Sequence, residues 1–249
     1  EGLLVGIGNP LLDISAIVDE ELLNKYGLKP DDAIMAEETH MPLYRELMDN
    51  SEGVTVRYQV NESHPTGTCA VLLTGTHRSL CANLAAAQNF TPDYLATEES
   101  RKSIEAAKYF YASGFFVAVS PDAIMQLAKH SHAKGLSFVM NLSAPFIALQ
   151  IAAMPKLSDK RQRAVVITQG CQPVILVENG EVTLIPVTAL TRDQIVDTNG
   201  AGDAFAGGFL AQMVLGSSYV TAVKCGIYTA THIIQASGCT VSGVSDFKS

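Results

Sequence analysis

The residue string with the clearest chemical meaning is Asp197-Thr198-Asn199-Gly200-Ala201-Gly202-Asp203, in the C-terminal part of the chain. The unpaired amides and the positive dipole end at the start of a helix bind phosphate, and residues this small let the group approach the backbone. Asp203 is placed to accept the proton of an attacking hydroxyl group. The string therefore predicts transfer of a phosphoryl group to an alcohol, which needs positioning and charge stabilisation. The plainer alternative is that Asn199-Gly200 is a turn and Asp203 a capping residue.

Other familiar phosphate and nucleophile motifs are missing from the sequence. Gly6-Ile7-Gly8 begins like a dinucleotide fingerprint, but Leu11 stands where a Rossmann site has its helix-packing glycine. The chain has no Gly-Lys-Ser/Thr P-loop, no His-Arg-Asp or Asp-Phe-Gly signature of protein kinases, and no Gly-x-Ser-x-Gly nucleophile elbow. The predicted phosphate chemistry therefore depends on the string that ends at Asp203.

Length and composition are those of a soluble globular protein with one large domain and a small addition. The 249 residues are 47% hydrophobic and 17% charged, which allows a sizeable core. The formal charge of -8 argues against nucleic acid or an anionic membrane as a partner. The five cysteines include no Cys-x-x-Cys pair, and no apolar run is long enough to span a membrane. We expect a monomer with reduced thiols and no histidine metal site, in the cytoplasm or also the nucleus.

The first third of the chain predicts short strands and helices that form a small antiparallel sheet. An apolar run over residues 3–8 is typical of a buried parallel strand that leads into a loop. Residues 55–60 and 68–74 alternate apolar and polar side chains on either side of a turn-rich stretch, which predicts a hairpin. Further strands are expected over 13–18 and 33–36, and helices over 20–26 and 42–49.

From residue 98 onward, helices and strands alternate, which predicts a parallel sheet covered by helices. Asn179-Gly180 suits a type I′ turn and predicts a hairpin over 174–187. Two long helices are expected to end the chain, one burying Phe205, Phe209 and Met213, the other Val220, Val223, Ile227 and Ile234. The remaining predicted elements are helices over 98–108 and 121–134, the second capped by Ser120, and strands over 109–113, 138–141 and 164–168.

Five further segments, spread over almost the whole chain, carry a family resemblance. They are Gly8-Asn9-Pro10-Leu11-Leu12-Asp13-Ile14-Ser15, Pro65-Thr66-Gly67-Thr68-Cys69, Arg78-Ser79-Leu80-Cys81-Ala82-Asn83-Leu84-Ala85-Ala86-Ala87, Gly114-Phe115-Phe116 and Asn141-Leu142-Ser143-Ala144-Pro145-Phe146. With the string 197–203, they make the chain similar to the ribokinase (PfkB) family of carbohydrate kinases, and especially to its branch that phosphorylates adenosine. The resemblance implies a ribokinase-like α/β fold, with a mostly parallel central sheet, helices on both faces and a small β-rich lid.

The resemblance also implies roles for the residues near the reacting groups. Asp203 would be the general base for the nucleoside 5′-hydroxyl, and the amides of Gly200, Ala201, Gly202 and Asp203 would stabilise the transferred phosphate. Asp13, helped by Asn9, would hold the ribose diol, since one carboxylate offers two acceptor oxygens; the alternative is a strand-end Asp that caps a turn. Arg78 would move toward the phosphates when the lid closes, although read by itself it is an ordinary surface arginine. Asn199 is assigned to the substrate side.

The walls around adenine and the ATP side follow from the same resemblance. The walls would be apolar or aromatic, from Met35, Leu80, Phe115 and Phe146, although each of them, read by itself, is an ordinary core residue. Thr168, Gly170 and Asn141 match positions on the ATP side, although Cys171 stands where relatives often carry a polar or basic residue. The implied ligands are adenosine, ATP and Mg²⁺, with a monovalent cation as a further candidate; no metal ligand is assigned.

Two motifs of the family have no counterpart in the sequence. They are a Gly-Gly-x-x-x-Asn segment that helps to hold the sugar and an Asn-x-x-Glu segment that organises magnesium, expected near the joins 50/51 and 155/156. A double natural deletion would remove sheet strands and expose core edges, so we expect the intact protein to carry further residues there. The predicted large domain comprises residues 1–12, 36–54 and 84–249, and the lid 13–35 and 55–83. The alternatives are a kinase of a free sugar or another nucleoside, and a nucleoside-binding protein without catalysis.

Overall fold

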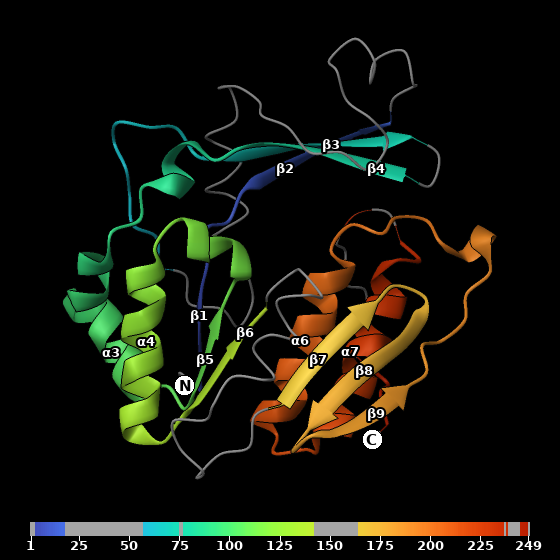
Figure 1. Cartoon of the computed structure of the whole chain (residues 1–249). Coiled ribbons are helices and arrows are strands. Elements are labelled where there is room, and N and C mark those ends of the chain that lie inside the picture. The colour runs from blue at the N-terminus through green and yellow to red at the C-terminus, as the bar shows by residue number, and fades with distance from the viewer. Residues whose placement is uncertain are drawn as a thin grey trace. The chain divides into compact units, whose positions relative to one another are not determined.

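The computed structural model describes residues 3–17, 57–74, 77–141, 164–236, 238 and 245–248. The chain divides into two compact units, Glu1–Met140 and Asn141–Ser249 (Figure 1). The predicted strand 33–36 and the predicted helices 20–26 and 42–49 lie outside the described residues.

The first unit contains a parallel sheet in the order β1-β5-β6, formed by β1 (Leu4–Ile7), β5 (Tyr109–Ala112) and β6 (Ser137–Met140). The helices α3 (Glu98–Ala106) and α4 (Pro121–Lys134) lie side by side next to this sheet in Figure 1. Buried side chains of β5 and α4, among them Phe110 and Leu127, form the core between them. These elements confirm the predicted alternation of helices and strands.

Two local expectations for this unit were wrong. The strand β1 is parallel to β5 as predicted, but it is only half-buried: Val5 and Ile7 pack against the core, whereas Leu4 keeps 39% of its surface exposed. Ser120 stands at the N-cap of α4, but its side chain makes no capping hydrogen bond. Pro121 at the first helical position has no N–H to satisfy, and Gly135 ends the helix in a left-handed conformation with φ of 66°.

A second sheet of the first unit is mixed rather than antiparallel. It consists of β2 (Leu12–Ile17), β3 (Thr68–Thr74) and β4 (His77–Asn83), with β3 parallel to β2 and antiparallel to β4. The predicted hairpin between 55–60 and β3 is wrong, since residues 57–60 form no strand. Side chains hold this segment instead: Gln59 Nε2 donates to Thr91 Oγ1 at 2.8 Å, and the Thr91 amide donates to Gln59 Oε1 at 2.9 Å.

The second unit contains an antiparallel sheet, β7 (Ala164–Gln169), β8 (Gln172–Glu178) and β9 (Glu181–Ile185). The predicted hairpin is confirmed, and Asn179 and Gly180 both have positive φ, 53° and 84°, as a type I′ turn requires. One face of the sheet packs on α7 through Val174, Leu176 and Ile185. Figure 1 shows the sheet lying against the helix pair of this unit.

The helix pair consists of α6 (Ala201–Val214) and α7 (Tyr219–Ile233), which approach each other closely. A Cβ atom added at Gly208 would lie 2.8 Å from the carbonyl oxygen of Cys225, and one at Gly226 would lie 2.8 Å from that of Phe205. The hydroxyl of Thr229 on α7 donates to the carbonyl of Ala204 on α6 at 2.6 Å. Two glycines and one threonine therefore fix where the start of α6 lies against α7.

The predicted buried faces of the two helices are largely confirmed. Val223 and Ile227 are buried, and Phe205, Phe209 and Val220 pack partly buried against the same core. Burial raises the pKa of the Cys225 thiol, so this side chain stays neutral. Short 3-10 helices at Ala85–Gln88, Pro92–Ala96, Gly114–Ala118 and Arg192–Gln194 were not predicted. Among the described helices, none is long and apolar enough to cross a membrane.

Candidate functional site

The predicted phosphate-binding string forms a tight turn into the first turn of α6. Gly200 is the N-cap residue, with a φ of 71° that favours glycine, and Asp203 lies in the first helical turn with its side chain exposed. The amide of Ala204 donates to the carbonyl of Gly200 at 2.8 Å, and that of Ala201 to Thr198 at 3.4 Å. The four residues at a helix start whose amides have no acceptor inside the helix are here Gly200, Ala201, Gly202 and Asp203. Their N–H groups are thus placed to bind an anion.

Gly202 has no packing reason to be a glycine. A Cβ atom built on it meets no atom within 4 Å, in contrast to Gly208 on the same helix, where such an atom lies 2.5 Å from the Thr229 hydroxyl. A glycine near a helix start costs about 0.5–1 kcal/mol relative to alanine. Open space in front of Gly202 fits the close approach of a ligand to the backbone. Asp203 is an acidic residue in the first turn of α6, where its charge also interacts favourably with the helix dipole, so the alternative reading as a capping residue stays open.

Asp197, the other carboxylate of the string, supports the turn instead of facing solvent. It is buried, with 7% of its surface exposed. Its Oδ1 accepts the amide of Asn199 at 2.8 Å and its Oδ2 the amide of Gly238 at 3.1 Å. The amides of Val196 and Asp197 both donate to the carbonyl of Ile234, at 2.8 and 3.2 Å. The turn before α6 is therefore anchored to the segment that follows α7.

Thr168 and Gly170, predicted for the ATP side, lie at the carboxyl end of β7. The register between β7 and β8 shifts between Ile167 and Gln169, so Thr168 sits at an irregularity of the kind that re-aims a side chain. Gly170 turns the chain with φ of 61°. Both residues are exposed, as is the neighbouring Cys171, a free thiol.

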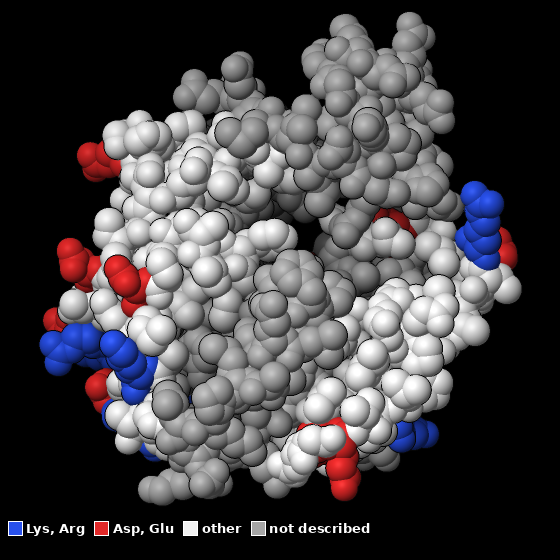
Figure 2. Space-filling view, viewed as in Figure 1, with Lys and Arg blue, Asp and Glu red and all other residues white. Residues whose placement is uncertain are grey.

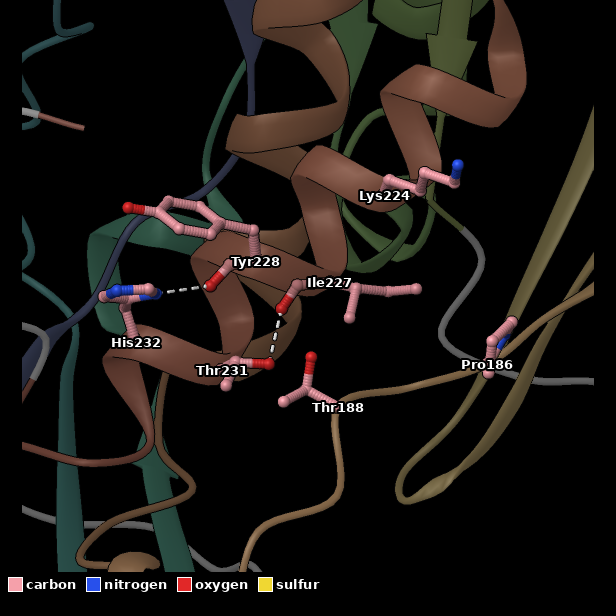
Figure 3. Close-up of a pocket in the computed structure, with 7 residues that line it drawn as sticks. All are labelled: Pro186, Thr188, Lys224, Ile227, Tyr228, Thr231 and His232. Carbon is pink, nitrogen blue, oxygen red and sulfur yellow. Dashed lines mark hydrogen bonds between the residues drawn. The ribbon is translucent and has the colours of Figure 1, made fainter. Parts of the chain in front are cut away.

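A pocket of about 330 Å³ opens in the second unit beside α7. Figure 3 shows Ile227 on the side of α7 where Thr188 and Pro186 lie, while Tyr228 and His232 project together from another side of the helix. The imidazole Nδ1 of His232 lies 2.9 Å from the Tyr228 carbonyl and must donate to it, which leaves Nε2 as the acceptor of the neutral ring. The lining residues are Pro186, Thr188, Lys224, Ile227, Tyr228, Thr231 and His232.

The sequence prediction missed this pocket. Its lining comes from two segments, the end of the β8–β9 hairpin and α7, that lie some forty positions apart in the chain. A weak signal existed, because Lys224, Tyr228 and His232 repeat every four residues and so share one face of a helix. That stripe lies beside the predicted apolar stripe of Val223 and Ile227.

In the first unit, three predicted residues belong to the mixed sheet. In the register, Asp13 on β2 is level with Cys69 on β3, and Leu80 and Arg78 on β4 are level with Val71 and Leu73. Because residues alternate between the faces of a strand, Asp13, Leu80 and Arg78 occupy positions of one face of this sheet. Asn9 lies in the loop between β1 and β2 and is half-buried.

The structure separates the two aromatic residues of Gly114-Phe115-Phe116. Phe116 is completely buried against Ala112 and Ala123, and its ring meets that of Phe90 edge-on at 5.1 Å. Phe115, in contrast, is 71% exposed. Phe115 is therefore not a core residue, so the alternative that this residue only packs in the core is excluded. Its contact with a ligand stays a prediction.

Of the remaining predicted site residues, two lie among the described residues and two do not. Asn141 directly follows β6 and is half-buried, and Asn199 is also half-buried. Met35 and Phe146 lie outside the described residues. Within the described ranges, no group of three His, Cys, Asp or Glu side chains could hold a metal ion.

Comparison with known proteins decides the family. The model of the pfkB family carbohydrate kinases matches residues 44–151 and 147–246. The chain belongs to the pfkB family of carbohydrate kinases. The two matched stretches together take in β3 to α7, including the phosphate-binding string, so the resemblance stated from the sequence is confirmed.

Relatives in this family match the chain over its full length. It is 35% identical to adenosine kinase 2 of Arabidopsis thaliana, an alignment that covers 100% of this chain and 98% of the relative, and 31% identical to adenosine kinase of Dictyostelium discoideum, with 94% and 95% covered. The first alignment extends over 338 positions against 249 residues in this chain, so the relative contains residues that have no counterpart here. This agrees with the absence of two family motifs from the sequence.

Solved structures of the family share the fold. The adenosine kinase of Anopheles gambiae, in complex with P1,P4-di(adenosine-5) tetraphosphate, is 40% identical, with a TM-score of 0.85 and 99% of both chains covered. The adenosine kinase of Schistosoma mansoni in complex with 2-fluoroadenosine is 26% identical, with a TM-score of 0.83 and 98% of both chains covered. The predicted ribokinase-like α/β fold is thereby confirmed. The proposed division into a large domain and a lid, at the boundaries given above, stays a prediction.

Proposed function

We propose that this protein is an adenosine kinase, which transfers the γ-phosphate of ATP to the 5′-hydroxyl of adenosine and releases AMP and ADP. The observation that carries the proposal is the start of α6, where open space in front of Gly202 adjoins the exposed carboxylate of Asp203. The supporting finding is that relatives aligned over the full length are named adenosine kinases. Salvage of purine nucleosides follows from that reaction.

The reaction uses the α6 start in two ways. The Asp203 carboxylate accepts the proton of the 5′-hydroxyl while the oxygen forms a bond to the γ-phosphorus, and the bond from that phosphorus to the bridging oxygen of ADP breaks. The amides of Gly200 to Asp203, with the helix dipole behind them, stabilise the charge on the transferred group. Mg²⁺ commonly binds through substrate phosphates and one or two carboxylates. When bound, Mg²⁺ would be held mainly by the phosphates of ATP and would neutralise part of their charge.

ATP occupies the second unit in this proposal. Its base fits the pocket beside α7, where Pro186, Ile227 and Tyr228 offer apolar and aromatic walls and Thr188 offers a polar edge. Thr168 and Gly170 at the end of β7 lie on the phosphate side, together with Asn141. The pocket of about 330 Å³ is within the size range of sites that bind small molecules.

Adenosine is assigned to the residues of the mixed sheet and its surroundings. Asp13 and Asn9 hold the ribose hydroxyls, Asn199 assists them, and Arg78 reaches the phosphates. The exposed Phe115 forms an adenine wall with Met35, Leu80 and Phe146. An aromatic residue that is 71% exposed next to a fully buried one suits a surface that is covered when a flat base binds.

Replacement of the proposed base tests the mechanism. Asp203→Asn keeps the size of the side chain but cannot accept the proton, so turnover should fall about 10²–10⁴-fold while adenosine affinity stays nearly unchanged. Asp193→Asn is the matched control, because Asp193 is also an exposed acid next to a short helix start in the same unit. Unchanged turnover in Asp203→Asn would remove Asp203 from the mechanism.

A substrate comparison separates this proposal from its alternatives. Phosphate transfer is measured for adenosine, inosine, guanosine and ribose, with and without Mg²⁺. Preference for ribose would indicate a sugar kinase, for which a wall at Phe115 has no use. Binding of adenosine without formation of ADP would indicate a nucleoside-binding protein. We further propose that the protein is a monomer in the cytoplasm. Its molecular mass in solution tests the first statement, and its location in cells tests the second.

A further inference from the structure

The C-terminal segment, residues 245–248, contacts the wall of the α7 pocket. The Tyr228 hydroxyl donates to Oδ1 of Asp246, and the amide of Asp246 donates back to the Tyr228 oxygen at 3.3 Å. The ring of Phe247 lies 5.5 Å from the Tyr228 ring, measured between centroids. Eighteen residues of sequence separate the two partners. Tyr228 is thus held at its hydroxyl and at its ring by the same short segment.

A second aromatic ring also lies close to the Tyr228 ring. The His232 ring lies one helical turn further along α7, with its centroid 4.1 Å from that of Tyr228. Both rings line the pocket and project from the same side of α7 in Figure 3. Tyr228 therefore has two ring neighbours and both a donor and an acceptor at its hydroxyl. Side chains that are constrained in this way keep one rotamer and keep the shape of the site they line.

The charge of Asp246 makes this contact stronger than one between neutral groups. The hydrogen bond from Tyr228 lowers the pKa of the Asp246 carboxyl. The carboxylate is therefore ionised at neutral pH, and hydrogen bonds to ionised acceptors are the stronger kind. Its negative charge would by itself repel an anionic nucleotide nearby, so charge alone does not explain an acidic residue at this place.

We propose that Asp246 and Phe247 position Tyr228 and thereby shape the nucleotide-binding wall of α7, so that nucleotide affinity depends on the C-terminal segment of the chain. This inference rests on the proposed function, because it takes the pocket to be the ATP site. Asp246 is a positioning residue: it acts through Tyr228 and contacts no substrate. The adenosine side of the reaction does not depend on it.

A set of variants tests the inference through the dissociation constant of ADP, measured by calorimetry on the whole chain. Asp246→Ala should weaken ADP binding about three- to tenfold, the range expected when one hydrogen bond that orders a site is lost. Asp246→Asn keeps an acceptor oxygen and the backbone donor and should restore most of the affinity. Glu181→Ala, which removes the same charge at the exposed hairpin end, should leave ADP affinity and turnover unchanged.

A double-mutant cycle with Tyr228→Phe shows whether Asp246 acts through Tyr228. Asp246→Ala should have little further effect in the Tyr228→Phe background, since the contact is already gone. The KM for adenosine should stay unchanged in every variant. Three outcomes would each overturn the inference: an equal effect of Asp246→Ala in both backgrounds, unchanged ADP affinity in Asp246→Ala, or tighter ADP binding because the negative charge is lost. If the unmodified protein binds no ADP at all, the proposed ATP site fails, and this inference fails with it.

Discussion

The close contact between α6 and α7 predicts opposite effects of the same substitution at neighbouring positions. Gly207 and Gly208 both lie inside α6. A Cβ atom at Gly207 meets nothing within 4 Å, whereas one at Gly208 lies 2.5 Å from Thr229 Oγ1, 2.9 Å from Thr229 Cγ2 and 2.8 Å from the Cys225 carbonyl oxygen. Alanine at Gly207 should therefore stabilise the protein, and alanine at Gly208 should destabilise it.

The magnitude follows from three contributions. Alanine gains about 1 kcal/mol over glycine inside a helix, and this gain applies at both positions. At Gly208, crowding costs about 1–3 kcal/mol, because the backbone carbonyl of Cys225 cannot rotate away. Moving Thr229 also breaks its 2.6 Å hydrogen bond to the Ala204 carbonyl, which costs about 1 kcal/mol. The free energy of unfolding should thus fall by about 1–3 kcal/mol in Gly208→Ala and rise by up to about 1 kcal/mol in Gly207→Ala. The two variants should therefore differ by about 2–4 kcal/mol.

Urea unfolding followed by far-ultraviolet circular dichroism measures this separation. Faster hydrogen exchange of the α6 and α7 amides in Gly208→Ala would show that the stability is lost in this helix pair. The reasoning would be refuted if Gly208→Ala were as stable as Gly207→Ala, because the helices would then have room between them. Gly202→Ala adds a functional comparison: its Cβ is also unobstructed, so stability should be kept while turnover falls.

Two further substitutions test single contacts. Asp197→Ala removes the acceptor of the Asn199 and Gly238 amides, so it should lower the free energy of unfolding by about 2–3 kcal/mol and also lower turnover. Urea unfolding and a phosphate-transfer assay measure the two effects. Full stability would show that the turn does not need this anchor. In the first unit, the hydrogen bond and charge of Lys134 lower the pKa of Glu105 below its usual 4.5. That exposed pair contributes stability above pH 4.5 and loses it as the pH falls through the lowered pKa. The small difference in the free energy of unfolding between Glu105→Gln and the unmodified protein should therefore vanish in acid. A difference that grows in acid would contradict the pairing.

Figure 2 shows how the charged side chains are distributed on one face of the described residues. Where residues are described on this face, blue and red side chains are interspersed and no continuous basic stretch is seen. The formal charge of -8 gives no general attraction for ATP. A local feature is therefore needed, and the amides at the start of α6 supply one.

The sequence by itself determined the elements whose signals are local. Pro121 and Gly135 mark the two ends of α4, and the positive φ angles of Asn179-Gly180 make a two-residue hairpin turn. The phosphate-binding string likewise appears as a helix start with Gly200 at the N-cap. In each case a few consecutive residues restrict the backbone directly, so no distant partner is needed.

Only the tertiary structure decided which distant segments meet. The parallel pairing of β3 with β2, in place of the predicted hairpin with 55–60, joins strands that are far apart in sequence. Phe115 and Phe116 are identical in type, and packing against Phe90 and Ala123 alone determines which of them is buried. The contact of Tyr228 with Asp246 carries no sequence signal of its own. Such contacts form because the folded chain buries apolar surface and pairs polar groups globally, and no short stretch of residues encodes that result.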